Sequence, residues 1–455
     1  MRLHVGNTRP LNVFSLFLLV GLAGTQPAWA NDLLTMYRNA LSNDASYAAA
    51  RSQYLATQEK LPQGRAGLLP TLNGLGSSAF TEARIHPRDN VTPNFTRQFN
   101  TNSVSLALSQ PLFRFGNWET YQQSKLQVAQ GELVLAQAQQ DVAIRVTKAY
   151  FDVLNANDTI QVIEAKKGAI SEQLEQAKRN FQVGTATVTD QQEAQARYDL
   201  AVAEEIAARN DLANKQSALQ QIIGVAAPAK LTPLKSNITL PNPNPLEASK
   251  WIAAAEEQSY AVTIAQANVE IARRNVGIQQ AGHLPTLDFN ANVARNSQTA
   301  STITALGTIT NQNVVGVSLV VPLFAGGATQ SKVREAAALE QVAKDNLLAA
   351  RRAAALTAQQ AYNGVQSGLA QVRALEAAEK SSLLALDSNK LGYKVGVRIN
   401  IDVLNAQQQV FTTRRDLQKA RYDTLVNSLN LKAATASLKE EDLQELNSLL
   451  DASTR

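Results

Sequence analysis

Phe181-Gln-Val-Gly-Thr-Ala-Thr-Val-Thr-Asp190 is followed, about 212 residues further along the chain, by Tyr393-Lys-Val-Gly-Val-Arg-Ile-Asn-Ile-Asp402. Both stretches place an aromatic residue before a glycine and an aspartate after it. Glycine enters the left-handed backbone region at little cost, so each stretch predicts a tight turn between two helices. The chain therefore contains one unit twice.

Other short motifs return in the same order and at a similar offset. Leu69-Pro-Thr-Leu72 matches Leu284-Pro-Thr-Leu287, Pro111-Leu-Phe113 matches Pro322-Leu-Phe324, and Ala149-Tyr150 matches Ala361-Tyr362. Each half has the pattern helix, strand, strand, helix, helix, which indicates two internal structural repeats.

Two long stretches, residues 117–182 and 328–393, contain no proline. Each predicts a helix of roughly 100 Å at 1.5 Å per residue, a length that requires coiled-coil packing. The shorter periodic runs 32–66 and 190–223 together match the length of one long helix. The runs 247–281 and 402–436 do the same, so two short helices could stack end to end beside a long one.

The predicted strands lie near residues 70–84 and 100–112, and near 287–293 and 315–321. Apolar and small or polar residues alternate along them, as at Val104, Leu106 and Leu108. This alternation is typical of membrane β-barrel strands, and half-buried strands of a soluble sandwich are the alternative.

Four strands cannot close a barrel, and lipid does not tolerate unpaired strand edges. Two copies would give eight strands and a filled interior, whereas three copies would give twelve strands and a lumen. The prediction is a mainly α-helical chain with a trimeric, 12-stranded membrane β-barrel, to which each chain contributes four strands.

The chain begins like an exported protein. Residues 1–30 predict a signal peptide, with Arg2 and Arg9 before an apolar stretch and Ala28-Trp-Ala30 at the cleavage site. The sequence has no cysteine, which excludes disulfides, thiolate metal sites and a lipid on cysteine. A formal charge of +5 is too small to predict nucleic-acid binding.

The repeats divide the rest of the chain. We expect the first repeat over 31–223, a linker over 224–246, the second repeat over 247–439 and a C-terminal tail over 440–455. The linker contains the proline-rich stretch Leu240-Pro-Asn-Pro-Asn-Pro245.

No catalytic arrangement is visible in the sequence. The mature chain has two histidines, His86 and His283, far apart and each in a predicted strand or loop. There is no phosphate-binding glycine loop and no nucleophile elbow. We therefore expect no enzyme activity, no metal site and no cofactor.

Over nearly the whole mature chain the sequence resembles the TolC family of outer-membrane factors. The resemblance rests on the two turn motifs, on Gln110-Pro-Leu-Phe-Arg-Phe-Gly116 and on Val321-Pro-Leu-Phe-Ala-Gly-Gly327. It implies a homotrimeric barrel in outer-membrane lipid, continuous with a long α-helical coiled-coil barrel in the periplasm, with a mixed equatorial region that contains the linker.

The resemblance also implies a function and partners. The chain would be an outer-membrane exit duct that accepts substrate from a periplasmic adaptor (a membrane fusion protein) and an inner-membrane ABC or proton-driven transporter. It would serve type I protein secretion, efflux, or both, and the cargo stays open. The alternative is a periplasmic coiled-coil scaffold or adaptor without channel activity.

The family's gate residues match Asp190, Tyr393 and Arg398. Arg398 offers guanidinium donors and Tyr393 a hydroxyl, so Asp190 could accept from both, within one chain or between chains. The alternative for Asp190 is a helix cap at the positive end of the helix that begins there.

The family's acidic constriction matches Asp402 and position 405, where this chain has Asn405. A trimeric ring would then carry three carboxylates instead of six, which weakens cation preference. The alternative for Asp402 is a helix N-cap. Gly184 and Gly396 match the family's adaptor contact at the periplasmic tip, or they serve only as left-handed turn residues.

Overall fold

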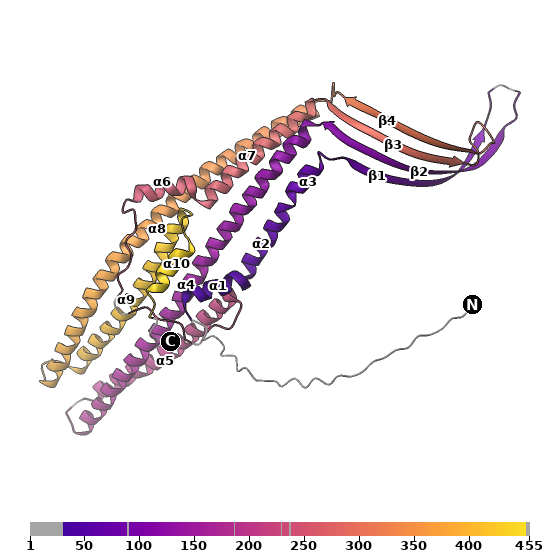
Figure 1. Ribbon diagram of the computed structural model, residues 1–455. Helices are drawn as coiled ribbons and strands as arrows, with labels where there is room; N and C mark the ends of the chain where they lie inside the picture. Colours follow the sequence, from indigo (N-terminus) through magenta and orange to yellow (C-terminus); the bar gives the residue numbers. More distant parts are fainter. Residues whose placement is uncertain (1–30, 89–90, 186, 229, 236–237, 452–455) are drawn as a thin grey trace, which may run out of the picture.

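The computed structural model describes residues 31–88, 91–185, 187–228, 230–235 and 238–451. The molecule is elongated and mainly helical, with one four-stranded sheet at one end (Figure 1). The predicted signal peptide, residues 1–30, lies outside the described residues. Within those residues, no helix combines the length and the apolar character needed to cross a membrane.

The elements follow the predicted order twice. The first half contains α1 (Leu33–Asn43), α2 (Ala45–Gln58), α3 (Lys60–Ala66), β1 (Thr71–Ile85), β2 (Phe95–Phe113), α4 (Phe115–Gln182) and α5 (Val188–Ile223). The second half contains α6 (Ala248–Gln258), α7 (Tyr260–Gln280), the 3-10 turn η1 (Ala281–His283), β3 (Thr286–Gln298), β4 (Thr308–Val320), α8 (Ala328–Lys394), α9 (Asn400–Ala434) and α10 (Glu440–Ser448).

The two long helices confirm the predicted lengths. Helix α4 has 68 residues and α8 has 67, which is roughly 100 Å each. Helices α1, α2, α3 and α5 all pack on α4, and α6, α7 and α9 pack on α8. In each half, short helices therefore lie one after another along a long one, as the summed lengths indicated.

The prediction of single helices over 32–66 and 247–281 is wrong. Asp44 and Ser259 have extended backbone, with ψ of 119° and 143°. Each side chain instead accepts a hydrogen bond from an amide of the next helix, at 2.8 Å from Tyr47 and 3.4 Å from Val262. Aspartate and serine are favoured N-caps, so both residues end one helix and begin another. The expected tail also contains a helix, α10.

The sheet is an antiparallel meander in the order β1-β2-β3-β4, so the repeats meet where β2 pairs with β3. Directly opposed residues share a face. One row on one face is apolar: Leu72, Leu108, Ala291 and Val315. The next row, on the other face, is largely polar or small: Asn73, Ala107, Asn292 and Val314. Leu72 is 62% exposed and Val315 is 71% exposed, so the apolar face has no cover within the chain.

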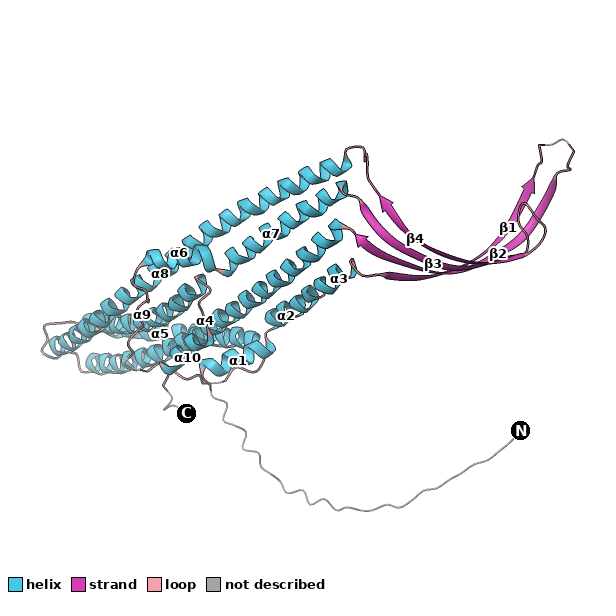
Figure 2. Ribbon diagram, turned by 45° about the horizontal axis from the view of Figure 1, so that its top comes forward, coloured by secondary structure: helices cyan, strands magenta, loops and turns pink. Residues whose placement is uncertain are grey.

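The junction between strands and helices is fixed by one ion pair. Arg114 is the single residue between β2 and α4, and Asp288 lies in β3. Two atoms of the guanidinium, Nε and Nη2, each lie 2.7 Å from a carboxylate oxygen of Asp288. This bidentate geometry sets the direction in which α4 leaves the curved sheet (Figure 2).

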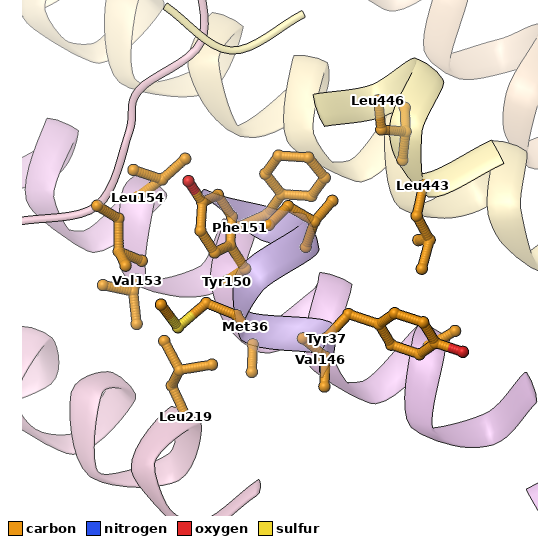
Figure 3. Packing of buried hydrophobic residues seen from close by; sticks show 14 of the residues in the cluster. Met36, Tyr37, Val146, Tyr150, Phe151, Val153, Leu154, Leu219, Leu443 and Leu446 are labelled. Carbon is orange, nitrogen blue, oxygen red and sulfur yellow. The ribbon is translucent and has the colours of Figure 1, made fainter. Parts of the chain in front are cut away.

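The largest apolar core lies where α1, α4, α5 and α10 meet (Figure 3). Tyr150 and Phe151 of α4 are buried there with Met36 of α1, Leu219 of α5 and Leu443 of α10. Because these residues come from both ends of the chain, the core ties the two repeats together. The Tyr150 hydroxyl donates to the carbonyl of Thr232 at 2.8 Å, so the linker is anchored to the same region.

We expect Asp44→Ala to destabilise this region by about 2 kcal/mol, the upper range for losing an N-cap. The change removes the cap of α2 and also the partner of Arg145, whose Nη1 lies 3.0 Å from the carboxylate. Asp44→Asn should cost less, because asparagine caps equally well and only the ion pair is lost. Thermal unfolding followed by circular dichroism measures both; equal losses would contradict a role for the charge.

The contribution of the Asp44 charge should depend on pH. Burial raises the pKa of Asp44, but hydrogen bonds from Arg145, Ser46 and the amide of Tyr47 outweigh it and lower the pKa to about 2. A lowered folded-state pKa stabilises above the unfolded value of about 3.9, and this stabilisation is lost as the pH falls. The difference between the native chain and Asp44→Asn should therefore vanish between about pH 4 and pH 2. A difference that stays constant over that range would contradict the assignment.

Candidate functional site

The end of the molecule opposite the sheet consists of two helical hairpins, α4–α5 and α8–α9 (Figure 1). Their turns have the same construction. Gly184 and Gly396 have φ of +75° and +79°. The amide after each glycine donates to a carbonyl five residues earlier: Thr185 to Asn180 at 2.8 Å and Val397 to Gly392 at 2.9 Å. This is the Schellman arrangement that ends helices with a left-handed residue.

Both turn glycines face open space. A Cβ built on Gly184 or on Gly396 would meet no heavy atom within 4 Å. Each glycine is therefore required by its backbone conformation and not by crowding within the chain. The backbone at both tips is open to close approach by a partner.

Asp190 lies in the first turn of α5, in a capping box with Thr187. Its Oδ2 accepts from the Thr187 amide at 3.0 Å, and the Thr187 hydroxyl accepts from the Asp190 amide at 3.2 Å. Asp190 therefore stabilises the first turn of α5. It occupies the third helical position of the capping box, and Thr187 is the N-cap. Within the chain, Asp190 is bonded neither to Tyr393 nor to Arg398.

Tyr393 and Arg398 have other partners in the chain. The Tyr393 hydroxyl accepts from the side-chain amide of Asn180 at 3.2 Å, which joins α8 to α4. Nη1 of Arg398 lies 3.7 Å from Oδ2 of Asp402, one turn further along in the sequence. Asn180 was missed by sequence reasoning, although it directly precedes the first turn motif.

Asp402 and Asn405 lie in the first turns of α9. Asp402 is not the N-cap, because that position is Ile399, whose side chain makes no capping bond. Oδ1 of Asn405 accepts from Nη2 of Arg197 on α5 at 3.2 Å. Arg197 is a second residue that the sequence did not single out, since its distance from Asn405 along the chain gives no signal.

The hairpins touch through few groups. Leu404 of α9 is buried with Ile170 of α4 and Ala201 of α5. Among the described residues near the turns, the side-chain hydrogen bonds Asn180–Tyr393 and Arg197–Asn405 also join the two hairpins. Each hairpin has its own core: Leu174 and Ala177 pack on Ala194, and Leu386 packs on Val403 and Val410. The hairpins are therefore firm units joined weakly to each other.

No group of metal-binding side chains occurs among the described residues. His86 and His283 are both exposed and lie in separate segments, one after β1 and one before β3.

Comparison with known proteins identifies the class of the chain. The family model described as outer membrane efflux protein matches residues 36–225 and 251–437. The outer membrane protein TolC of Vibrio cholerae is 31% identical over 92% of this chain and 94% of its own length. The proteases secretion protein PrtF of Dickeya chrysanthemi is 31% identical over 95% of this chain and 93% of its own length.

Solved structures have the same fold at lower identity. The outer membrane channel CmeC of Campylobacter jejuni covers 93% of this chain and 90% of its own, with a TM-score of 0.77 and 18% identity. The match to VceC of Vibrio cholerae covers 89% of this chain and 96% of VceC, with a TM-score of 0.76 and 18% identity. The chain therefore belongs to the outer membrane efflux protein family and is an outer-membrane exit duct with a periplasmic helical extension, not an enzyme.

Proposed function

We propose that three copies of the chain assemble into one duct that serves type I protein secretion, efflux of small compounds, or both. The observation that carries this proposal is the sheet, which has one exposed apolar face and two open edges, β1 and β4. In a four-stranded antiparallel meander β1 and β4 run in opposite directions, so β4 of one copy can pair with β1 of the next. Three copies would close twelve strands around a lumen.

The helices would continue this duct towards the inner membrane. At roughly 100 Å, α4 and α8 are long enough to span much of an aqueous compartment. The relatives support both kinds of cargo, since some are named for protease secretion and others for efflux. A periplasmic adaptor and an inner-membrane transporter would supply the cargo and the energy. A soluble scaffold is disfavoured, because it would leave the apolar face of the sheet in water.

Outer-membrane extraction tests this assembly. We expect the chain in the outer-membrane fraction as a heat-labile trimer, because pairing of β1 with β4 satisfies every edge only in a closed ring. Gel electrophoresis with and without heating measures it. Recovery as a soluble periplasmic monomer would contradict the proposal and favour the scaffold.

The periplasmic mouth would be held shut by the bonds around Tyr393, Arg398 and Asp190. Tyr393 ties the second hairpin to Asn180 of the first. Asp190 uses Oδ2 for its capping box, which leaves Oδ1 for a donor such as Arg398 of a neighbouring copy. A neutral hydrogen bond contributes about 0.5–1.5 kcal/mol, and one to a charged group about 1.5–3 kcal/mol. Bonds of this size can hold a mouth at rest and still yield to a docking partner.

We expect Arg398→Ser and Tyr393→Phe each to raise the single-channel conductance of purified trimers in planar bilayers several-fold. Both changes remove a donor or acceptor from the gate while the hairpin cores stay intact. Arg415→Ser is the matched control, because Arg415 lies on α9, the helix that begins just after Arg398, and the ion pair described for it is with its neighbour Asp416. If the gate variants conduct like the control, Arg398 and Tyr393 are structural residues.

The two turns would receive the adaptor. Because Gly184 and Gly396 have no side chain and no neighbour within 4 Å, another backbone can approach them closely. Gly396→Asn should weaken capture of the adaptor encoded with the transporter while trimer assembly persists, since asparagine tolerates left-handed backbone better than other residues with side chains. Asn389→Ala, a change at a half-buried position on the preceding turns of α8, is the control. Equal capture by both variants would contradict tip docking.

A further inference from the structure

The apolar face of the sheet ends at an arginine. Counted from the helices, the first positions of β3 on this face are apolar: Leu287, Phe289, Ala291 and Val293. The next position on the same face is Arg295, which is opposed by Val104 of β2 and Asn311 of β4. Beyond it the face is largely polar or small, with Asn102 of β2 opposite Ser297 of β3. Arg295 therefore marks the outer boundary of the apolar band.

The length of β3 places this boundary at a membrane interface of the proposed barrel. The strand leaves the helices at Thr286 and runs outward (Figure 1), and Arg295 follows nine residues later. Nine residues span about 30 Å at 3.3 Å per residue. At a tilt of about 40°, which is typical of membrane barrels, this distance rises about 23 Å along the membrane normal, close to their apolar band of about 25 Å. Because the helices extend into the periplasm, Arg295 would lie at the level of the outer leaflet.

The charge of Arg295 is not neutralised within the chain. Its side chain is exposed, and among the described residues its guanidinium has no hydrogen-bond or ion-pair partner. The two carboxylates of the strands are distant: Asp288 lies on the other face and binds Arg114, and Glu82 lies near the far end of β1 and pairs with Arg84 at 3.7 Å. Each is about 20 Å or more along the strands from the level of Arg295, beyond the screening length of about 10 Å at 0.1 M salt.

A hollow of about 630 Å³ lies beside Arg295. Its lining includes Gly74 and Gly76 of β1 and Asn311 and Asn313 of β4. A Cβ built on either glycine would meet no heavy atom within 4 Å, so the space above this part of β1 is open. Apolar side chains of β2 line the same hollow. The hollow therefore combines apolar walls with one guanidinium and two amide groups that can donate hydrogen bonds, and its lining contains no carboxylate.

We propose that this hollow binds the phosphate-bearing headgroup of an outer-leaflet lipid, with the guanidinium of Arg295 on the phosphate and an acyl chain along the apolar rows below it. The inference rests on the proposed trimeric duct, whose apolar face contacts lipid. A guanidinium matches the geometry of phosphate with two parallel donors, and charge-assisted bonds of this kind are strong. Basic pockets on membrane proteins bind anionic headgroups in the same way. Lipid A, the phosphorylated glycolipid of the outer leaflet, has this chemistry and is the occupant that the site fits.

Binding of lipid A to purified trimers tests the proposal. Native mass spectrometry of trimers in detergent counts the bound lipids and gives their affinity. The probes are lipid A, the same lipid without its phosphates, and inorganic phosphate. The native trimer should bind one lipid A per copy, and should bind the dephosphorylated lipid about tenfold more weakly, because a charge-assisted bond is lost. Equal affinity for the two lipids, or binding of inorganic phosphate as tight as that of lipid A, would overturn the proposal.

Three variants separate the charge from the shape of the hollow. Arg295→Gln should weaken lipid A binding about tenfold, as removal of the phosphates does. Arg295→Lys should weaken it less, because lysine keeps the charge but loses the two parallel donors. Gly76→Leu should also weaken it without changing any charge, because leucine would fill the hollow. Leucine suits a lipid-facing position, so the trimer should still assemble.

Arg84→Gln is the matched control, because Arg84 lies on the same face of the sheet, beyond the apolar band, and pairs with Glu82. It should keep the native affinity for lipid A. A loss of affinity in Arg84→Gln as large as that in Arg295→Gln would overturn the proposal.

Trimers freed of lipid distinguish a lipid site from a link between copies. Without added lipid, native and Arg295→Gln trimers should dissociate at the same temperature on heated gels. A lower temperature for Arg295→Gln, reproduced by Glu82→Gln, would make Arg295 an ion-pair partner of a neighbouring copy and would overturn the proposal. Failure of the native chain to form any trimer would instead contradict the proposed duct itself, and the lipid site with it.

Discussion

The backbone of the sheet edges imposes the constraint on which the rest of the molecule depends. In lipid, an unpaired amide or carbonyl costs several kcal/mol, and water is not present to satisfy it. Strands β1 and β4 each pair on one side only within the chain. A four-stranded unit is therefore incomplete by itself. In the proposed ring of copies, the open edges would pair with each other and the apolar face would contact lipid. Because β2 passes into α4 through Arg114 alone, the sheet also fixes where α4 begins.

Stability is unevenly distributed along the helices. At the equator, Tyr422 of α9 stacks on Phe151 of α4 with ring centroids 5.4 Å apart, and its hydroxyl donates to Asp158 at 2.6 Å. That contact lies within the large core shared by both repeats. Towards the tips, among the described residues, the hairpins share a smaller apolar cluster around Leu404 and two side-chain hydrogen bonds. Local opening takes place where few apolar contacts must be broken. The hairpins can therefore separate at their tips while the equator holds.

The sequence predicted an element correctly where a residue type has one main structural role. Glycine before the turn of each hairpin, absence of proline along α4 and α8, and alternation in the strands located the turns, the long helices and the sheet. The helix breaks at Asp44 and Ser259 escaped notice, because both residues also occur on exposed helix surfaces and become caps only when the backbone extends. The repeat did not predict them, since the two caps are different amino acids.

The partners of the candidate gate residues could not be predicted for a different reason. Asn180 meets Tyr393 and Arg197 meets Asn405 only because the two hairpins lie side by side, and the rotation of one coiled coil against another is set by its whole length. Tyr393 belongs to the second turn motif, but its partner Asn180 lies outside both turn motifs. Asp190 illustrates the point: its capping box is local and readable from Thr187, whereas any bond of its second oxygen depends on a neighbour that the motif does not contain.

In a symmetric assembly, a single charged side chain can matter more for permeating ions than for the stability of the fold. An exposed ion pair within one chain contributes little to stability, typically about 0–1 kcal/mol. A charge of the same kind beside a pore is repeated by the symmetry axis, and every permeating ion passes all copies at short range, where low-dielectric walls focus the field. Within one chain, the amide oxygen of Asn405 accepts a single hydrogen bond from Arg197. In the proposed trimer the same side chain would occur three times around the axis. A charge introduced at this position would therefore act more strongly on ions in the proposed lumen than on the stability of one chain.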